Sequence, residues 1–218
     1  MNEPESRETL VRYTANERTN HWIIALAFVL AALSGLALFH PALFWMSTLF
    51  GGGPWTRILH PFIGLVMTIA FAVLAATLWK HNRMQHSDWQ WLRQAKDVMN
   101  NREERLPQAG RYNGGQKLLF FVLVACMLGL LLSGLVIWRA YFSLYFSVDA
   151  IRLASLVHAL CAFILICAII VHIYAAIWVK GSMRAMTRGV VTAGWAWKHH
   201  RAWFREVTHA ANSRTRPD

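Results

Sequence analysis

The chain has 218 residues, of which 56% are hydrophobic, and its formal net charge at pH 7 is +11. A soluble domain of this size seldom combines so much apolar content with so many basic side chains, so we expect the two to be separated along the chain. This composition argues against an ordinary soluble enzyme and favours an integral membrane protein.

Four long runs contain no Asp, Glu, Lys or Arg: residues 21–49, 58–79, 118–138 and 153–179. About 20 apolar residues in a helix cross the hydrocarbon core of a bilayer, and each run is long enough. We therefore predict an all-α membrane protein with one membrane domain over residues 1–218. Its four transmembrane helices are expected to form a bundle, at about 21–39, 58–79, 118–138 and 153–179. The polar residues 1–20 have no signal-peptide pattern, so the first helix is expected to be retained.

The basic residues predict the orientation of these helices. Three Lys or Arg precede the first helix, eight lie between the second and third, and eight follow the fourth, whereas the other two loops contain only Arg57, Arg139 and Arg152. Because cytoplasmic loops are the basic ones, we expect both termini, the loop 80–117 and the tail 180–218 in the cytoplasm. Topology and contact with anionic lipid account for the positive charge, so no nucleic-acid partner is expected.

The connecting segments predict short surface helices. Residues 40–56 are apolar and aromatic and end in three glycines and a proline, which is typical of an interfacial helix followed by a turn. In the loop 80–117, "DWQWLRQAKDVM" has helical spacing. The tail contains Trp195, Trp197, Trp203 and Phe204 among basic residues, which indicates an amphipathic helix on the inner surface or against a partner subunit.

Small residues recur inside the predicted spans. "ALSGLALF" in the first helix and "LLSGLVIW" in the third contain Gly35 and Gly134, which allow close approach by another helix or by a flat cofactor. Cys126, Cys161 and Cys167 all lie in apolar runs without CxxC spacing. We interpret these cysteines as small packing residues.

Two histidines interrupt the last apolar run. His158 and His172 are about four helical turns apart, so they share one face of the fourth helix at a separation of about 21 Å. With the predicted orientation His158 lies near the outer surface and His172 near the inner one. His60 lies at the outer depth and His21 at the inner depth, which gives an outer pair and an inner pair.

Paired imidazoles in an apolar shell favour one kind of cofactor. Zinc requires three or four protein ligands, and the nearest acidic side chain to any pair is Glu17. Haem iron takes two axial ligands, so two histidine pairs predict two b haems that form an electron path. A haem-free anchor or small transporter with a histidine proton relay is the alternative, although the spans contain no Asp or Glu. The remaining histidines are expected to face solvent or lipid headgroups: His40, His81, His86, His199, His200 and His209.

A second candidate site is "RYNGGQK", residues 111–117, at the start of the third helix. Gly115 permits close approach of a ligand, and Asn113 and Gln116 offer amide donors and acceptors. A quinone headgroup fits such a place, and an ordinary turn with a helix N-cap is the alternative.

Five segments, taken in chain order, closely resemble the cytochrome b (gamma) subunit of respiratory formate dehydrogenases: "RTNHW", "RILHPF", "RYNGGQK", "LVHALCAFIL" and "VHIYAAIWVKGSM". The resemblance extends over nearly the whole chain. It implies that His60 and His158 ligate an outer haem b, and that His21 and His172 ligate an inner one. More distant similarity leaves open the cytochrome b of a nickel–iron hydrogenase or related reductase, and a stand-alone cytochrome of the b561 type.

The same resemblance implies a place in a larger complex. Menaquinone or ubiquinone would be reduced near His172, Asn113, Gly115 and Gln116. Formate would be oxidised by a molybdenum or tungsten subunit outside the bacterial inner membrane, and an iron–sulfur subunit would pass electrons to the outer haem. Inward electron flow, with proton uptake by the quinone from the cytoplasm, would contribute to the proton-motive force. No side chain of this chain is expected to be catalytic in formate oxidation.

Overall fold

The computed structural model describes residues 8–100, 102 and 105–214. The two chain ends, which are predicted to be cytoplasmic, lie outside these ranges. The described residues form two compact units. We call the first the helix unit, residues 19–77 and 122–173. The second, the strand unit, contains the described parts of residues 1–18, 78–121 and 174–218.

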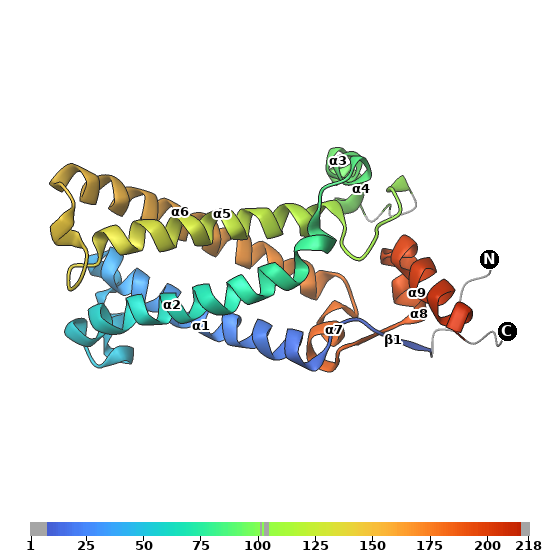
Figure 1. Cartoon of the computed structure of the whole chain (residues 1–218), viewed down its shortest axis with the longest axis horizontal. Coiled ribbons are helices and arrows are strands. Elements are labelled where there is room, and N and C mark those ends of the chain that lie inside the picture. Colours follow the sequence, from blue (N-terminus) through green and yellow to red (C-terminus); the bar gives the residue numbers. More distant parts are fainter. Residues whose placement is uncertain (1–7, 101, 103–104, 215–218) are drawn as a thin grey trace. The chain divides into compact units, whose positions relative to one another are not determined.

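Four long apolar helices dominate the chain (Figure 1): α1 (Ala15–Phe39), α2 (Gly53–Leu78), α5 (Gly114–Ile137) and α6 (Val148–Trp178). Each is long and apolar enough to cross a membrane. Many of their large apolar side chains face outward, as expected where lipid replaces water as the solvent. The prediction of an all-α membrane protein with four transmembrane helices is confirmed.

The long helices begin four to six residues before the predicted starts and end within one residue of the predicted ends. The predicted starts lie where charged and polar side chains give way to apolar ones. A helix does not need apolar residues in its first turns, because these turns can project beyond the hydrocarbon core. Glu17 in α1 and Asp149 in α6 lie in such first turns.

Apolar side chains from all four helices, from alanine to phenylalanine in size, form the interior of the helix unit. Cys126 is 95% buried there, and Gly129 lies so close to Cys161 that an added Cβ would be 2.6 Å from its Sγ. All three cysteines are free thiols, but the packing role holds only for Cys126 and Cys161, because Cys167 is exposed. The buried apolar residues are Ala27, Ala31, Met67, Phe71, Cys126, Met127 and Leu165.

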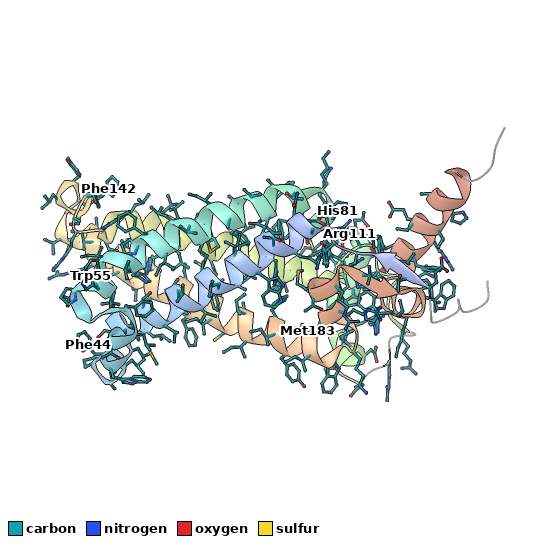
Figure 2. The ribbon with its side chains drawn as sticks, turned by 90° about the horizontal axis from the view of Figure 1, so that it is seen from below. Phe44, Trp55, His81, Arg111, Phe142 and Met183 are labelled. Atoms are coloured by element: carbon teal, nitrogen blue, oxygen red, sulfur yellow. The ribbon has the colours of Figure 1, made fainter. Side chains whose placement is uncertain are left out.

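Aromatic side chains gather at one end of the helix unit. Phe44, Trp55 and Phe142 lie at this end and are exposed (Figure 2). Phe44 belongs to the short 3₁₀ helix η1 (Pro41–Phe50), and positive φ angles at Gly51 and Gly52, 85° and 95°, turn the chain into α2. The predicted interfacial helix and turn are therefore present, and the exposed rings have the character of a membrane-interface belt.

The strand unit contains two short strands that the sequence analysis did not predict. Strand β1 (Thr9–Val11) pairs in antiparallel register with β2 (Val190–Thr192). Helices α7 (Ser182–Arg188), α8 (Ala193–His199) and α9 (Arg201–Arg214) accompany β2. Around this pair the buried apolar core consists of Ala185, Val191, Ala193, Ala196, Trp203 and Phe204.

The tail thus differs from the single amphipathic surface helix predicted for it. Residues 190–192 form a strand, and the helix that follows is broken at His200. Trp203 and Phe204 are buried within the strand unit, where Arg12 places its guanidinium carbon 4.3 Å from the Trp203 ring centre. The aromatic residues therefore build a small core of their own, because β1 supplies a partner that no local pattern reveals.

The segment between α2 and α5 is helical where the sequence predicts it, over most of residues 88–99. It contains η2 (Trp79–Asn82), α3 (His86–Arg93) and α4 (Ala95–Met99). Lys117, in the first turns of α5, donates to Asp88 Oδ2 at 2.7 Å and to the Arg83 carbonyl at 3.1 Å. This buried ion pair fixes α3 to the start of α5.

Candidate functional site

The structure brings His60 and His158 together inside the helix unit. His60 projects from α2 and His158 from α6, and their ring centres are 6.2 Å apart with an interplanar angle of 71°. The sequence places these two residues at the same predicted depth, and their imidazoles face each other.

His21 and His172 form a second pair in the same unit. His21 belongs to α1 and His172 to α6, and their ring centres lie 6.3 Å apart with an interplanar angle of 50°. The Trp22 ring meets His21 edge-on at 5.5 Å. Helix α6 thus contributes one histidine to each pair.

Serine hydroxyls contact the first pair, and the sequence analysis missed them. Ser34 Oγ lies 2.9 Å from His60 Nδ1, and Ser133 Oγ lies 3.0 Å from His158 Nδ1. The two serines belong to the repeated "SGL" segments of α1 and α5. The repeat is the available signal, because it places a serine directly before each of the two glycines.

The glycines of the same segments lie against the same rings. A Cβ added at Gly35 would be 3.2 Å from His60 Cε1, and one added at Gly134 would be 3.3 Å from His158 Cε1. Any larger residue would push on the imidazole. These glycines therefore make room for histidine rings.

The turn before α5 has the geometry of a capped helix start. The Gln116 backbone N–H donates to Asn113 Oδ1 at 2.9 Å, and the Asn113 backbone N–H donates to Gln116 Oε1 at 3.0 Å. This reciprocal pair is a capping box, so both side-chain oxygens already serve the helix. A Cβ at Gly115 would approach the Trp91 ring to 2.8 Å, so only glycine fits there.

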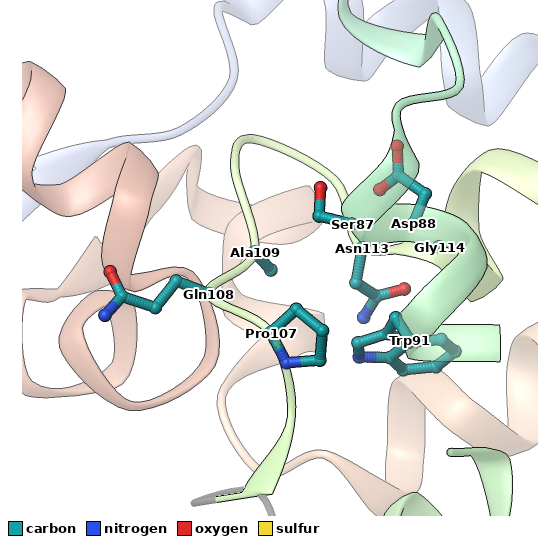
Figure 3. Close-up of a pocket in the computed structure, with 8 residues that line it drawn as sticks. All are labelled: Ser87, Asp88, Trp91, Pro107, Gln108, Ala109, Asn113 and Gly114. Carbon is teal, nitrogen blue, oxygen red and sulfur yellow. The ribbon is translucent and has the colours of Figure 1, made fainter. Parts of the chain in front are cut away.

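A small pocket adjoins this turn in the strand unit (Figure 3). The Asn113 amide and the Trp91 indole both line it, and together they offer a hydrogen-bonding group and a flat apolar surface. Asn113, Gly115 and Gln116 belong to the strand unit and His172 to the helix unit, so their grouping in one quinone site stays a prediction. The lining residues are Ser87, Asp88, Trp91, Pro107, Gln108, Ala109, Asn113 and Gly114.

Comparison with known sequences assigns the chain to a family. The sequence model of a family described as prokaryotic cytochrome b561 matches residues 12–189. The chain belongs to the prokaryotic cytochrome b561 family.

Several relatives of this cytochrome are subunits of named complexes. The cytochrome b556(fdo) subunit of formate dehydrogenase from Escherichia coli K12 is 46% identical over 201 residues, 92% of this chain and 94% of that relative. The formate dehydrogenase cytochrome b556 subunit of Haemophilus influenzae is 40% identical over 90% of this chain and 83% of its own length. The cytochrome b556(Fdn) subunit of the nitrate-inducible formate dehydrogenase of Escherichia coli K12 is 39% identical over 92% of this chain and 93% of that relative. These relatives confirm the resemblance inferred from the sequence.

Both histidine pairs in this cytochrome suit the haem b that its family implies. An iron between two imidazoles, with metal–nitrogen bonds of about 2 Å and each ring centre about 1 Å behind its nitrogen, separates the ring centres by about 6 Å. The observed separations are 6.2 and 6.3 Å. Among the described residues no group of three or more His, Cys, Asp or Glu side chains converges. The donor set therefore fits a metal that brings its other ligands with it, as haem iron does.

One other histidine of the cytochrome contradicts the sequence analysis. His200 was expected to face solvent or lipid headgroups, but it is 2% exposed, and its Nδ1 lies 2.9 Å from the Gly110 carbonyl oxygen. Burial, together with the nearby Arg12 guanidinium, lowers the pKa of His200 to about 3. The ring is therefore a neutral core residue of the strand unit, and it donates from Nδ1 to the carbonyl.

Proposed function

We propose that this cytochrome is the di-haem membrane subunit of a formate dehydrogenase and passes electrons through two b haems to a quinone. The observation that carries the proposal is the presence of two histidine pairs, each spaced for one iron, on the apolar helices of one unit. Relatives that are formate dehydrogenase subunits over nearly their whole length support the choice of complex.

Each pair has one role in this proposal. His60 and His158 hold one haem, and His21 and His172 hold the other. When bound, each haem supplies a one-electron carrier inside an apolar medium that electrons could not otherwise cross. The chain itself ligates the iron, orients the imidazoles and excludes water.

The direction of transfer follows from the predicted orientation. Electrons enter from an iron–sulfur subunit, fed by a molybdenum or tungsten subunit that oxidises formate on the outer side of the bacterial inner membrane. They leave to menaquinone or ubiquinone on the cytoplasmic side, where proton uptake contributes to the proton-motive force. His172, Asn113, Gly115 and Gln116 are the proposed quinone residues, and the similarity of the chain to formate dehydrogenase cytochrome b subunits supports this choice.

The test is a haem count on the complex purified from membranes. We expect two b haems per chain by reduced-minus-oxidised spectroscopy and haem extraction, and we expect iron–sulfur and molybdenum or tungsten subunits to copurify. His158→Ala should remove one spectral component. His172→Ala should remove the other and abolish formate-dependent quinone reduction, because that haem lies last in the path.

The matched control is His209→Ala, which alters an exposed histidine of the strand unit and should leave both components in place. One haem per chain, or none, in the wild-type complex would refute the di-haem proposal. Copurification of a hydrogenase instead would keep the haems and overturn the choice of complex.

A further inference from the structure

We propose that Ser34 and Ser133 are positioning residues that hold His60 and His158 as the Nδ1–H tautomer, so that each presents Nε2 to the same iron. The inference rests on the proposed haem ligation and deepens it. It concerns the serine hydroxyls of α1 and α5, which touch no iron themselves.

Each serine hydroxyl has only one proton to donate. Ser34 Oγ lies 2.7 Å from the Leu30 carbonyl oxygen, and Ser133 Oγ lies 2.5 Å from the Gly129 carbonyl oxygen. A carbonyl only accepts, so the hydroxyl proton is used in this bond back to the preceding turn. The serine oxygen can then only accept from the imidazole. Nδ1 must therefore carry a proton, and Nε2 is the nitrogen left free for a metal.

Both serines are buried in the helix unit. Ser34 has no exposed surface and Ser133 is 5% exposed, so water has no access to compete for these bonds. A hydrogen bond in such an apolar interior is stronger than one at a wet surface. The tautomer and the ring orientation are thus fixed before any cofactor is bound.

A glycine follows each of the two serines in the sequence. A Cβ added at Gly35 or Gly134 would come within 3.2 or 3.3 Å of the ring that the preceding serine holds. Each Ser–Gly pair therefore restrains one imidazole by a hydrogen bond and leaves space beside it. Helix α1 does this for the histidine of α2, and α5 does it for the histidine of α6, which explains the repeated "SGL" segment.

The other pair lacks this arrangement at one ligand. His21 Nδ1 is buried and has no hydrogen-bond partner among the described residues. A hydrogen bond from Nδ1–H makes a histidine ligand more basic and favours the oxidised metal. The two haem sites should therefore differ in potential partly through the serines.

The test uses Ser34→Ala, Ser133→Ala and the double variant in the complete complex. Potentiometric titration and the electron paramagnetic resonance of the ferric haems report the ligands directly, without reference to turnover. We expect two haems to be retained, with the potential of one component raised and its resonance shifted. The same component should respond in both variants, and it should be the one that His158→Ala removes.

Ser155→Ala is the matched control. Ser155 lies on α6 and, like Ser34 and Ser133, bonds back to the carbonyl four residues earlier, that of Ile151 at 2.8 Å, but it is exposed. Its replacement should change neither component. Ser34→Thr and Ser133→Thr, which keep a hydroxyl, should restore the wild-type signals.

Three outcomes would overturn it: unchanged potentials and resonances in the double alanine variant, a matching shift in Ser155→Ala, or threonine variants that behave like alanine. A wild-type complex without two histidine-ligated haems would instead refute the proposed function, which keeps the two failures distinct.

Discussion

Histidines in this chain behave according to what surrounds each ring. Four of them meet in pairs inside the helix unit, whereas His200 lies in the core of the strand unit against the Gly110 carbonyl. Burial lowers the pKa of His200 from 6.5 to about 3. An unfolded strand unit would expose this ring to water and restore an ordinary pKa.

The stability of the strand unit should therefore fall in mild acid. Between pH 6.5 and pH 3 the unfolded state binds a proton at His200 that the folded state does not. The free energy of unfolding therefore decreases as the pH falls through this range. At pH 5 the expected loss is about 2 kcal/mol. Hydrogen exchange of residues 190–204 in nanodiscs at pH 7 and pH 5, corrected for intrinsic rates, measures it.

His200→Asn keeps a donor near the position of Nδ1 and removes the titration, so it should remove this pH dependence. His209→Asn, at an exposed histidine, is the control and should leave it intact. An equal pH dependence in the His200→Asn variant would show that another group is responsible.

At the scale of elements, the four long helices and the histidine pairs were predictable for physical reasons. Runs of about 20 or more residues without charged side chains indicate membrane-spanning helices. The 100° turn per residue of an α-helix places His158 and His172 on one face. The strands were not predictable, because β1 and β2 have three residues each and lie at opposite ends of the chain. The hydroxyl contacts to His60 and His158 were equally hidden, since a serine in a span usually bonds to its own helix.

The junction of α3 and α5 depends on one buried ion pair. The Lys117 and Asp88 side chains are only 7% and 8% exposed. Lys117→Met would leave the Asp88 carboxylate buried without a counter-charge, at an expected cost of about 3–5 kcal/mol. We expect faster hydrogen exchange in α3 and faster cleavage by trypsin at the exposed Arg93.

The double variant Lys117→Met with Asp88→Asn should recover most of this loss. Asparagine carries no charge, and its side-chain oxygen can still accept the hydrogen bond that the Gln85 backbone N–H donates to Asp88 Oδ2 at 2.8 Å. Lys96→Met, at an exposed lysine of α4, should have little effect. If the double variant exchanges as fast as the single one, lost packing of the lysine stem and not the stranded charge is the cause.

At the scale of the whole molecule, the distribution of basic residues predicts which loops face the cytoplasm. Asn100 lies in the basic loop 80–117, and Leu144 lies in the opposite loop, where it is 91% exposed. The proposed direction of electron flow requires these two loops to be on opposite sides of the membrane.

Cysteine labelling tests this topology. In a variant with all three native cysteines replaced by alanine, Leu144→Cys should react with a membrane-impermeant maleimide in spheroplasts. Asn100→Cys should react only after the membrane is opened. The reverse pattern would place the quinone on the outer side and remove the proposed contribution to the proton-motive force.

The pairing of β1 with β2 has a consequence for how the protein is made. Residues 9–11 leave the ribosome long before residues 190–192, and at about 5–20 residues per second the first strand waits roughly 10 seconds or longer for its partner. During that time Arg12 lacks two of the aromatic rings that surround it in the folded chain, because Trp195 and Trp203 follow β2 in the sequence. Closure of this strand pair therefore marks a chain whose four membrane helices have all been translated, and truncated products should expose an unpaired strand to cellular proteases.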